Sequence, residues 1–201
     1  YSAAGTNFEQ TTGYATIDAE NANSLPSALQ VLQYRQIDTA TSRLYTASQT
    51  AMPAPPLRSN GRLFVEVATG IRPLVVVANP SSQDATVEFS VADGAGAVTS
   101  SSSIIVPAGG QFSGFINDSP LSLTVAPAGA LTFSSTVPVA VSALRYFTNA
   151  SETSVISAIP VADVGVAAPA GMVIPDFADG GGWNSQFILL NPSDVQMTGE
   201  L

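Results

Sequence analysis

The chain has 201 residues, of which 45% are hydrophobic and 10% are charged, so it can bury a core and is not expected to be globally disordered. Fifteen carboxylates outnumber six basic residues, giving a net charge of -9 that disfavours binding to nucleic acids or anionic lipids. Cysteine, histidine and lysine are all absent, which excludes disulfide bonds, thiolate or imidazole metal ligands, and Ser–His or Ser–Lys catalysis.

Short strands and turns are predicted along most of the chain, because serine, threonine, proline and glycine interrupt every helical window. The clearest strand is 86–91, where Val87, Phe89 and Val91 alternate with polar residues. The apolar run 74–78 is expected to be covered on both faces. In chain order the predicted strands are 27–36, 74–78, 86–91, 102–106, 111–116, 130–134, 139–146, 155–161 and 187–190, with a turn near Val137-Pro138.

A repeat decides the assignment of 27–36, which could otherwise be helical. Asn79-Pro80-Ser81 returns 112 residues later as Asn191-Pro192-Ser193, and both copies follow an apolar run. The same ungapped offset aligns Pro26 with Pro138, Tyr34 with Tyr146, and Thr41-Ser42 with Thr153-Ser154. A period of about 112 residues favours tandem antiparallel β-sandwich domains over a solenoid of short repeats.

The phase of this repeat divides the chain into three parts. Residues 1–57 match the C-terminal part of a preceding sandwich, 58–168 a complete one, and 169–201 the N-terminal strands of a following one. A sandwich cut within a unit leaves unpaired strand edges. We therefore expect either a longer parent protein or completion by strand addition from another chain. No leader is visible at Tyr1, and no run of eighteen apolar residues predicts a membrane-spanning helix.

Several motifs resemble a known type of repeat. They are Phe177–Trp183 with its Asp-Gly-Gly-Gly-Trp sequence, the apolar run before Asn191-Pro192-Ser193, Ser134–Ala140, and Leu144-Arg145-Tyr146. Together they are similar to the tandem Ig-like or fibronectin-III-like repeats of large secreted or surface proteins of environmental bacteria. The resemblance implies a surface, adhesive or accessory module. The middle unit departs from it, because Ser59–Arg62 lacks the glycine run.

The sequence contains four candidate sites. Asp176 and Asp179, beside three glycines, are weak calcium candidates; two carboxylates fall short of the six to eight oxygens that calcium takes, and an acidic interdomain loop is the alternative. Trp183 and Asn184 are candidates for ligand binding by an exposed aromatic, such as sugar stacking. Asn-Pro-Ser is either a ligand motif or, more simply, a turn. Asp38-Thr39-Ala40 faintly resembles an aspartic-protease motif but lacks its glycine.

The sequence therefore predicts an all-β, non-catalytic structural or interaction module, secreted or at the bacterial surface or in the periplasm. It would act as a spacer, adhesin or assembly subunit, with other protein chains or further repeats as partners. No catalytic residue and no cofactor other than calcium is predicted. The alternative is a carbohydrate-binding accessory module of an extracellular enzyme. A carboxylate-dependent hydrolase is a third class, and we do not expect it.

Overall fold

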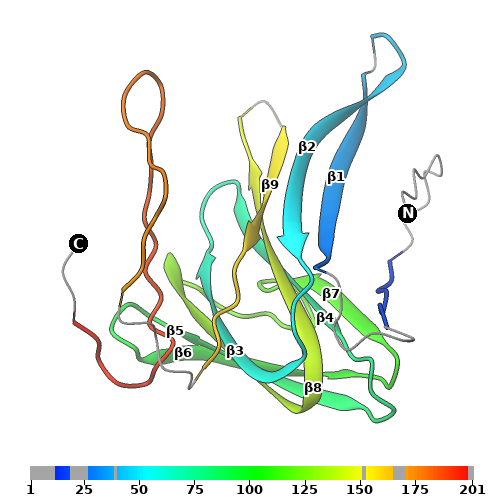
Figure 1. Ribbon diagram of the computed structural model, residues 1–201, viewed down its shortest axis with the longest axis vertical. Coiled ribbons are helices and arrows are strands. Elements are labelled where there is room, and N and C mark those ends of the chain that lie inside the picture. The colour runs from blue at the N-terminus through cyan, green and yellow to red at the C-terminus, as the bar shows by residue number, and fades with distance from the viewer. Residues whose placement is uncertain (1–11, 19–26, 39, 151–152, 165–170, 199–201) are drawn as a thin grey trace.

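The computed structural model describes residues 12–18, 27–38, 40–150, 153–164 and 171–198. Within these ranges the chain is all-β, every strand pairing is antiparallel, and no helix occurs (Figure 1). The strands are β1 (Leu29–Asp38), β2 (Arg43–Pro53), β3 (Arg58–Glu66), β4 (Ile71–Ala78), β5 (Ala85–Ala92), β6 (Val98–Val106), β7 (Gln111–Phe115), β8 (Ala128–Thr148) and β9 (Ser154–Ile159). A search of the described residues for a helix able to cross a membrane finds none.

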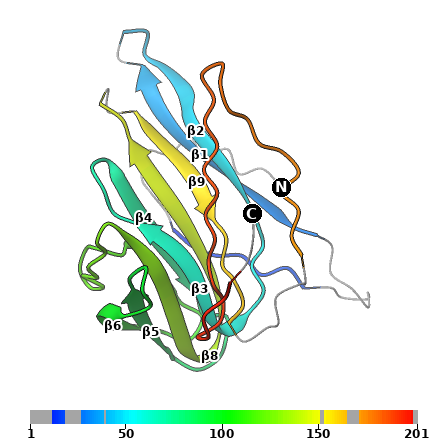
Figure 2. The ribbon, with the colours of Figure 1, turned by 90° about the vertical axis from the view of Figure 1, so that its left-hand side faces the viewer.

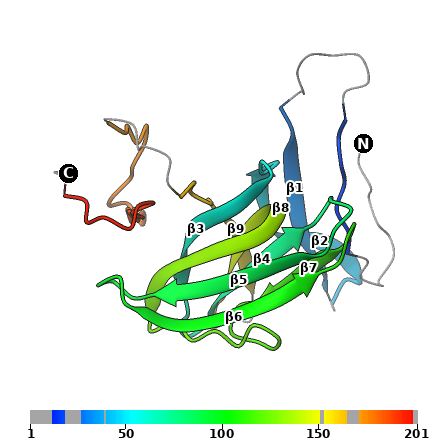
Figure 3. The ribbon, with the colours of Figure 1, turned by 90° about the horizontal axis from the view of Figure 1, so that it is seen from below.

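Two layers of strands share β8. Its first half lies between β5 and β3, which gives one layer the order β6–β5–β8–β3 (Figure 3). Its second half lies between β4 and β9, which gives the other layer the order β7–β4–β8–β9. The two layers form a sandwich-like arrangement from β3 to β9.

The prediction of two strands separated by a turn near Val137-Pro138 is wrong, since β8 runs through this point. Pairing with β5 ends at Ser135, and pairing with β4 begins at Ala140. Proline lacks the N–H that a strand ladder needs, so it is tolerated where a strand has no neighbour on one side. Pro138 lies where β8 passes from one layer to the other, and there it bends the strand without ending it.

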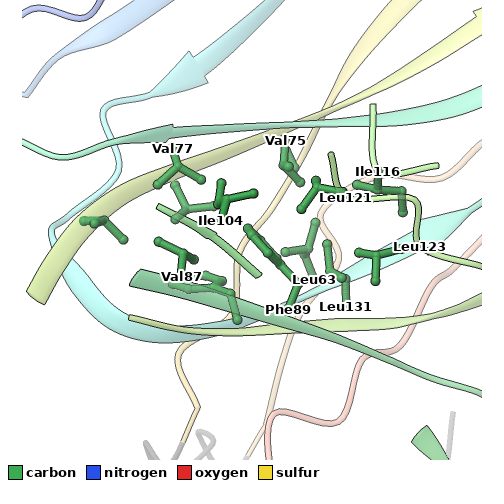
Figure 4. Packing of buried hydrophobic residues seen from close by; sticks show 14 of the residues in the cluster. Leu63, Val75, Val77, Val87, Phe89, Ile104, Ile116, Leu121, Leu123 and Leu131 are labelled. Atoms are coloured by element: carbon green, nitrogen blue, oxygen red, sulfur yellow. The ribbon is translucent and has the colours of Figure 1, made fainter. Parts of the chain in front are cut away.

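The core lies between the layers and follows the alternation of the strands (Figure 4). Val87, Phe89 and Val91 of β5 are buried, as predicted, while the intervening residues are at least partly exposed. In β4, Val75 and Val77 face the core, whereas Leu74 and Val76 on the other face are only half-buried. The expectation that this strand is covered on both faces is therefore only partly met.

The β1–β2 hairpin lies beside β9 and is joined to it through side chains. The Oγ atom of Ser48 accepts a hydrogen bond from the Ile156 N–H (2.8 Å), and the Oγ1 atom of Thr50 accepts one from the Ala158 N–H (3.1 Å). Two hydroxyl groups on β2 thus occupy the outer edge of β9 in place of a backbone ladder. Residues 27–36, which the repeat assigned to a strand, lie mostly in β1.

The chain segments that enter and leave the sandwich lie next to each other. Arg62 of β3 and Ala162 exchange backbone hydrogen bonds of 3.0 and 2.8 Å in an antiparallel bridge. One step further out, the Arg58 guanidinium contacts the Asp163 carboxylate at 2.7 Å and donates to the Val161 carbonyl. We call these contacts the end clasp. The chain enters and leaves the sandwich at one edge.

The C-terminal residues 171–198, called the arm below, extend from this edge as a long loop that turns back on itself (Figures 1 and 2). The predicted strand at 187–190 has no ladder partner among the described residues. Its apolar side chains therefore stay largely exposed, although the same type of sequence forms the central strand β4.

Candidate interaction surfaces

The first Asn-Pro-Ser turn is an internal fastening of the sandwich. The Asn79 side chain is completely buried. Its amide nitrogen donates to the carbonyls of Gln83 (2.7 Å), Val106 (3.0 Å) and Pro107 (3.1 Å), and its oxygen accepts from the N–H and hydroxyl of Ser81. Asn79 thereby joins the end of β4 to the start of β5 and the end of β6. With no atom facing solvent, it is a structural residue of the turn.

The second Asn-Pro-Ser turn repeats the local bonding pattern. The Asn191 amide nitrogen donates to the Val195 carbonyl at 2.8 Å, and its oxygen accepts from the Ser193 N–H at 2.8 Å. The Ser193 hydroxyl accepts from the Val195 N–H, just as the Ser81 hydroxyl accepts from the Gln83 N–H. The bonds that Asn79 donates to the Val106 and Pro107 carbonyls have no counterpart at Asn191 among the described residues.

Arg62 fastens the second turn to the sandwich. Its guanidinium donates to the backbone carbonyls of Asn191 (3.0 Å) and Ser193 (2.9 Å) and contacts the Asp194 carboxylate at 2.6 Å. Its Nε donates to the Thr132 hydroxyl on β8, which fixes the orientation of the guanidinium plane. A shallow hollow lies beside this contact, lined by the 93–96 turn, Gly129 and residues 189–197. Sequence reasoning missed Arg62, because no motif links it to residues about 130 positions away.

The glycine run forms the tip of a hairpin within the arm. Gly180 and Trp183 exchange backbone hydrogen bonds of 3.0 Å across Gly181 and Gly182, both of which have positive φ. Such a two-residue turn suits glycine, since other residues are strained at positive φ. Below the tip, the Phe177 and Phe187 rings meet edge to face. The hairpin presents Trp183, which is 72% exposed, with Asn184 next to it.

The calcium candidates Asp176 and Asp179 lie on this same hairpin and are exposed. In the part of the chain that the structure describes, no three or more acidic, histidine or cysteine residues come together as a metal site would require. Two other aspartates, Asp163 and Asp194, each pair with an arginine. Calcium binding at Asp176 and Asp179 remains a prediction.

The two tyrosines related by the repeat have different surroundings. Tyr146 on β8 is half-buried, with its ring edge to face against Phe115 of β7. Burial, and secondarily the proximity of Tyr34, raises the pKa of the Tyr146 phenol. Tyr34 on β1 is more exposed, and its hydroxyl accepts a hydrogen bond from Gln36, which in turn accepts one from Tyr45. The half-buried environment of Tyr146 is typical of a side chain that packs against its neighbours.

Asp38 also has a local structural role. Its carboxylate accepts hydrogen bonds from the backbone N–H groups of Ala40 (2.8 Å) and Thr41 (3.3 Å) in the β1–β2 turn. The Ala40 bond, followed by bonds from the side chain and backbone of Thr41, lowers the Asp38 pKa. This bonding is typical of a turn-forming aspartate. Thr39 of the protease-like motif lies outside the described residues.

Comparisons with known proteins give little further information. No protein-family model and no curated protein matches the sequence. Among solved structures, one titled Anabaena sensory rhodopsin transducer is similar over 42% of this chain and 78% of that chain, at 20% sequence identity and a TM-score of 0.38. A likeness of this strength is too weak to identify a shared fold or function.

Proposed function

We propose that this chain is a non-catalytic structural and interaction module, built from tandem Ig-like β-sandwich units of a secreted or cell-surface bacterial protein. The observation that carries the proposal is the pair of Asn-Pro-Ser turns. They lie 112 residues apart and share three matching hydrogen bonds between corresponding residues. Repetition of a sandwich unit is typical of proteins that span distance or present surfaces.

A second correspondence supports the repeat. The β1–β2 hairpin and the hairpin of β8 with β9 occupy matching places in the sequence, and Tyr34 and Tyr146 both lie in the first strand of their hairpin. The strand pairing in the two hairpins differs in register: Tyr34 lies opposite Ser48, whereas Tyr146 lies opposite Ile156, which at the 112-residue offset corresponds to Leu44. The correspondence between the two hairpins therefore lies in the order of their strands and not in the register of their pairing.

The use of charged residues supports a structural role. Four of the six arginines pair with carboxylates, and each pair joins segments distant in sequence. The Arg145–Glu66 pair joins β8 to β3, and Arg72–Asp118 joins β4 to the loop after β7. Carboxylates engaged in this way fasten the fold and are not arranged as the free pair that a glycosidase needs.

Carbohydrate binding is the second candidate, and the exposure of Trp183 beside the glycine turn favours it. Two measurements separate the candidates. Labelling of intact cells of the source bacterium with an antibody to this chain tests its location. Pull-down with insoluble polysaccharides, using the wild type and Trp183→Ala, tests glycan binding. The structural proposal expects surface labelling and no saturable binding. Saturable binding lost in Trp183→Ala would favour the glycan module, and labelling only after permeabilisation would contradict the location.

A further inference from the structure

One edge of β1 has no ladder partner among the described residues. β1 pairs with β2 on one side, and neither layer of the sandwich adds a strand to its other side. Leu29 and Val31 on β1 are 66% and 55% exposed. An open strand edge that carries apolar side chains is a template for the addition of another strand.

Residues 183–190 of the arm are a segment of strand length without a partner. At the 112-residue offset they correspond to 71–78, which form β4. Val75 and Val77 of β4 are completely buried, whereas Phe187 and Leu189 at the matching positions are 46% and 67% exposed. The arm thus has the sequence of a central strand. The residues that would face the core in such a strand are instead partly exposed to solvent.

The sandwich provides the register in which such a strand pairs. β4 pairs antiparallel with the second half of β8, where Val75 lies opposite Ala143 and Val77 lies opposite Val141. All four side chains face the core and are buried. The repeat places β1 at the position of this half of β8, so the same register can be written for β1 and the arm.

In that register Phe187 lies opposite Val31, and Leu189 lies opposite Leu29. These are the four exposed apolar residues identified above, and they form two cross-strand pairs on one face. A shift of one residue would direct every side chain of the arm to the opposite face. The register is taken from β4 and β8, and it places the exposed apolar residues of the arm opposite those of β1. This match is the observation that carries the inference.

We propose that residues 183–190 of one copy add as an antiparallel strand to the open edge of β1 in a second copy. The partner is a second molecule because the arm and β1 lie on opposite sides of the molecule in Figures 1 and 3. This inference rests on the repeat organisation in the proposed function and specifies its partner. Backbone hydrogen bonds supply the attraction, and the two apolar pairs set the register.

Engineered cysteines test the register directly, since the chain has none of its own. Gln30 and Ile188 are opposite each other in the proposed register, on the face away from the four apolar residues, and both are exposed. A full-length chain carrying Gln30→Cys is mixed with one carrying Ile188→Cys and oxidised gently. We expect a disulfide-linked heterodimer to form, because directly opposed residues are within bonding distance.

The matched control replaces Ile188→Cys by Gln186→Cys, which lies on the same face but is displaced by two residues, about 7 Å along the strand. We expect at least tenfold less heterodimer from this pair. Equal yields from both pairs would overturn the proposed register. A second outcome would also overturn the proposal. In it, the two single-cysteine chains form no heterodimer, while one chain carrying both Gln30→Cys and Ile188→Cys forms a disulfide within itself.

A second variant removes the apolar pairs. Phe187→Asp with Leu189→Asp should weaken self-association at least tenfold in sedimentation velocity, while far-UV circular dichroism stays unchanged because both positions are exposed. A wild-type chain that is monomeric at all accessible concentrations would reject the strand pairing. A monomeric chain together with surface labelling of cells would leave the proposed function in place. Saturable polysaccharide binding that depends on Trp183 would reject the proposed function, whatever the result of the cross-linking.

Discussion

Replacing Asn79 with alanine tests whether the Asn-Pro-Ser turn is a fastening of the core. The change removes hydrogen bonds to the carbonyls of Gln83, Val106 and Pro107, and it leaves the Ser81 N–H without its acceptor. A buried polar group left without a partner costs about 1–3 kcal/mol, and the bond to Val106 is fully buried. The expected loss is about 3 kcal/mol, or roughly 10 °C in Tm.

Asn191→Ala is the matched control, because the same side chain makes the same local bonds in a turn that is only partly buried. Its expected effect is within about 0.5 kcal/mol. Urea unfolding followed by far-UV circular dichroism measures both variants, with the slope of the transition compared to show that the unfolded surface is unchanged. Equal losses in the two variants, or a loss below about 1 kcal/mol for Asn79→Ala, would refute the argument that burial decides the role of this motif.

Three further predictions concern the core, the arm and a half-buried phenol. Ile104→Ala should lower the free energy of unfolding in urea by about 2–5 kcal/mol, because this side chain is only 7% exposed. Its neighbour Ile105 is 67% exposed, so Ile105→Ala should lower it by less than about 0.5 kcal/mol. Similar losses in the two variants would contradict the assigned faces of β6. Arg62→Ala should speed amide hydrogen exchange across residues 191–195, with Arg43→Ala as control; unchanged exchange would show that Arg62 does not hold the arm. Above pH 10 the native chain should lose stability, since the raised pKa of Tyr146 keeps its proton bound in the folded state at a pH where the unfolded chain has released it. Spectrophotometric titration should show a late tyrosine that disappears in Tyr146→Phe, and a persisting late phase would assign the shift to another residue.

The sequence predicts strands well where their neighbours are determined by alternation alone. In β5 each second side chain is apolar, so one face had to be buried, and Val87, Phe89 and Val91 are. The ambiguous segment 27–36 was assigned to a strand only through its correspondence with the second half of β8. Local propensity could not have decided it, because leucines at these spacings suit either a helix or a strand.

Features that depend on long-range contacts were not predictable. Pro138 suggested a turn, but the site tolerates proline because β8 changes layers there, a fact of topology and not of local sequence. The predicted strand at 187–190 carries a strand pattern, yet a strand also needs a neighbour with an open edge. Arg62 and its contacts with the second Asn-Pro-Ser turn could not be found from spacing, since nothing in the sequence marks a guanidinium as the partner of backbone carbonyls.

The end clasp has a mechanical consequence. Because Arg62 and Ala162 pair antiparallel, the chain leading into Arg58 and the chain leaving Asp163 depart from the same end of the bridge. Tension applied to these two segments loads the Arg58–Asp163 contact first and the Arg62–Ala162 bonds next, one after another. Bonds that open in sequence resist less force than bonds sheared together. A protein under such tension would lengthen by peeling β3 from the edge of its layer, and would behave as an extensible tether and not as a rigid rod.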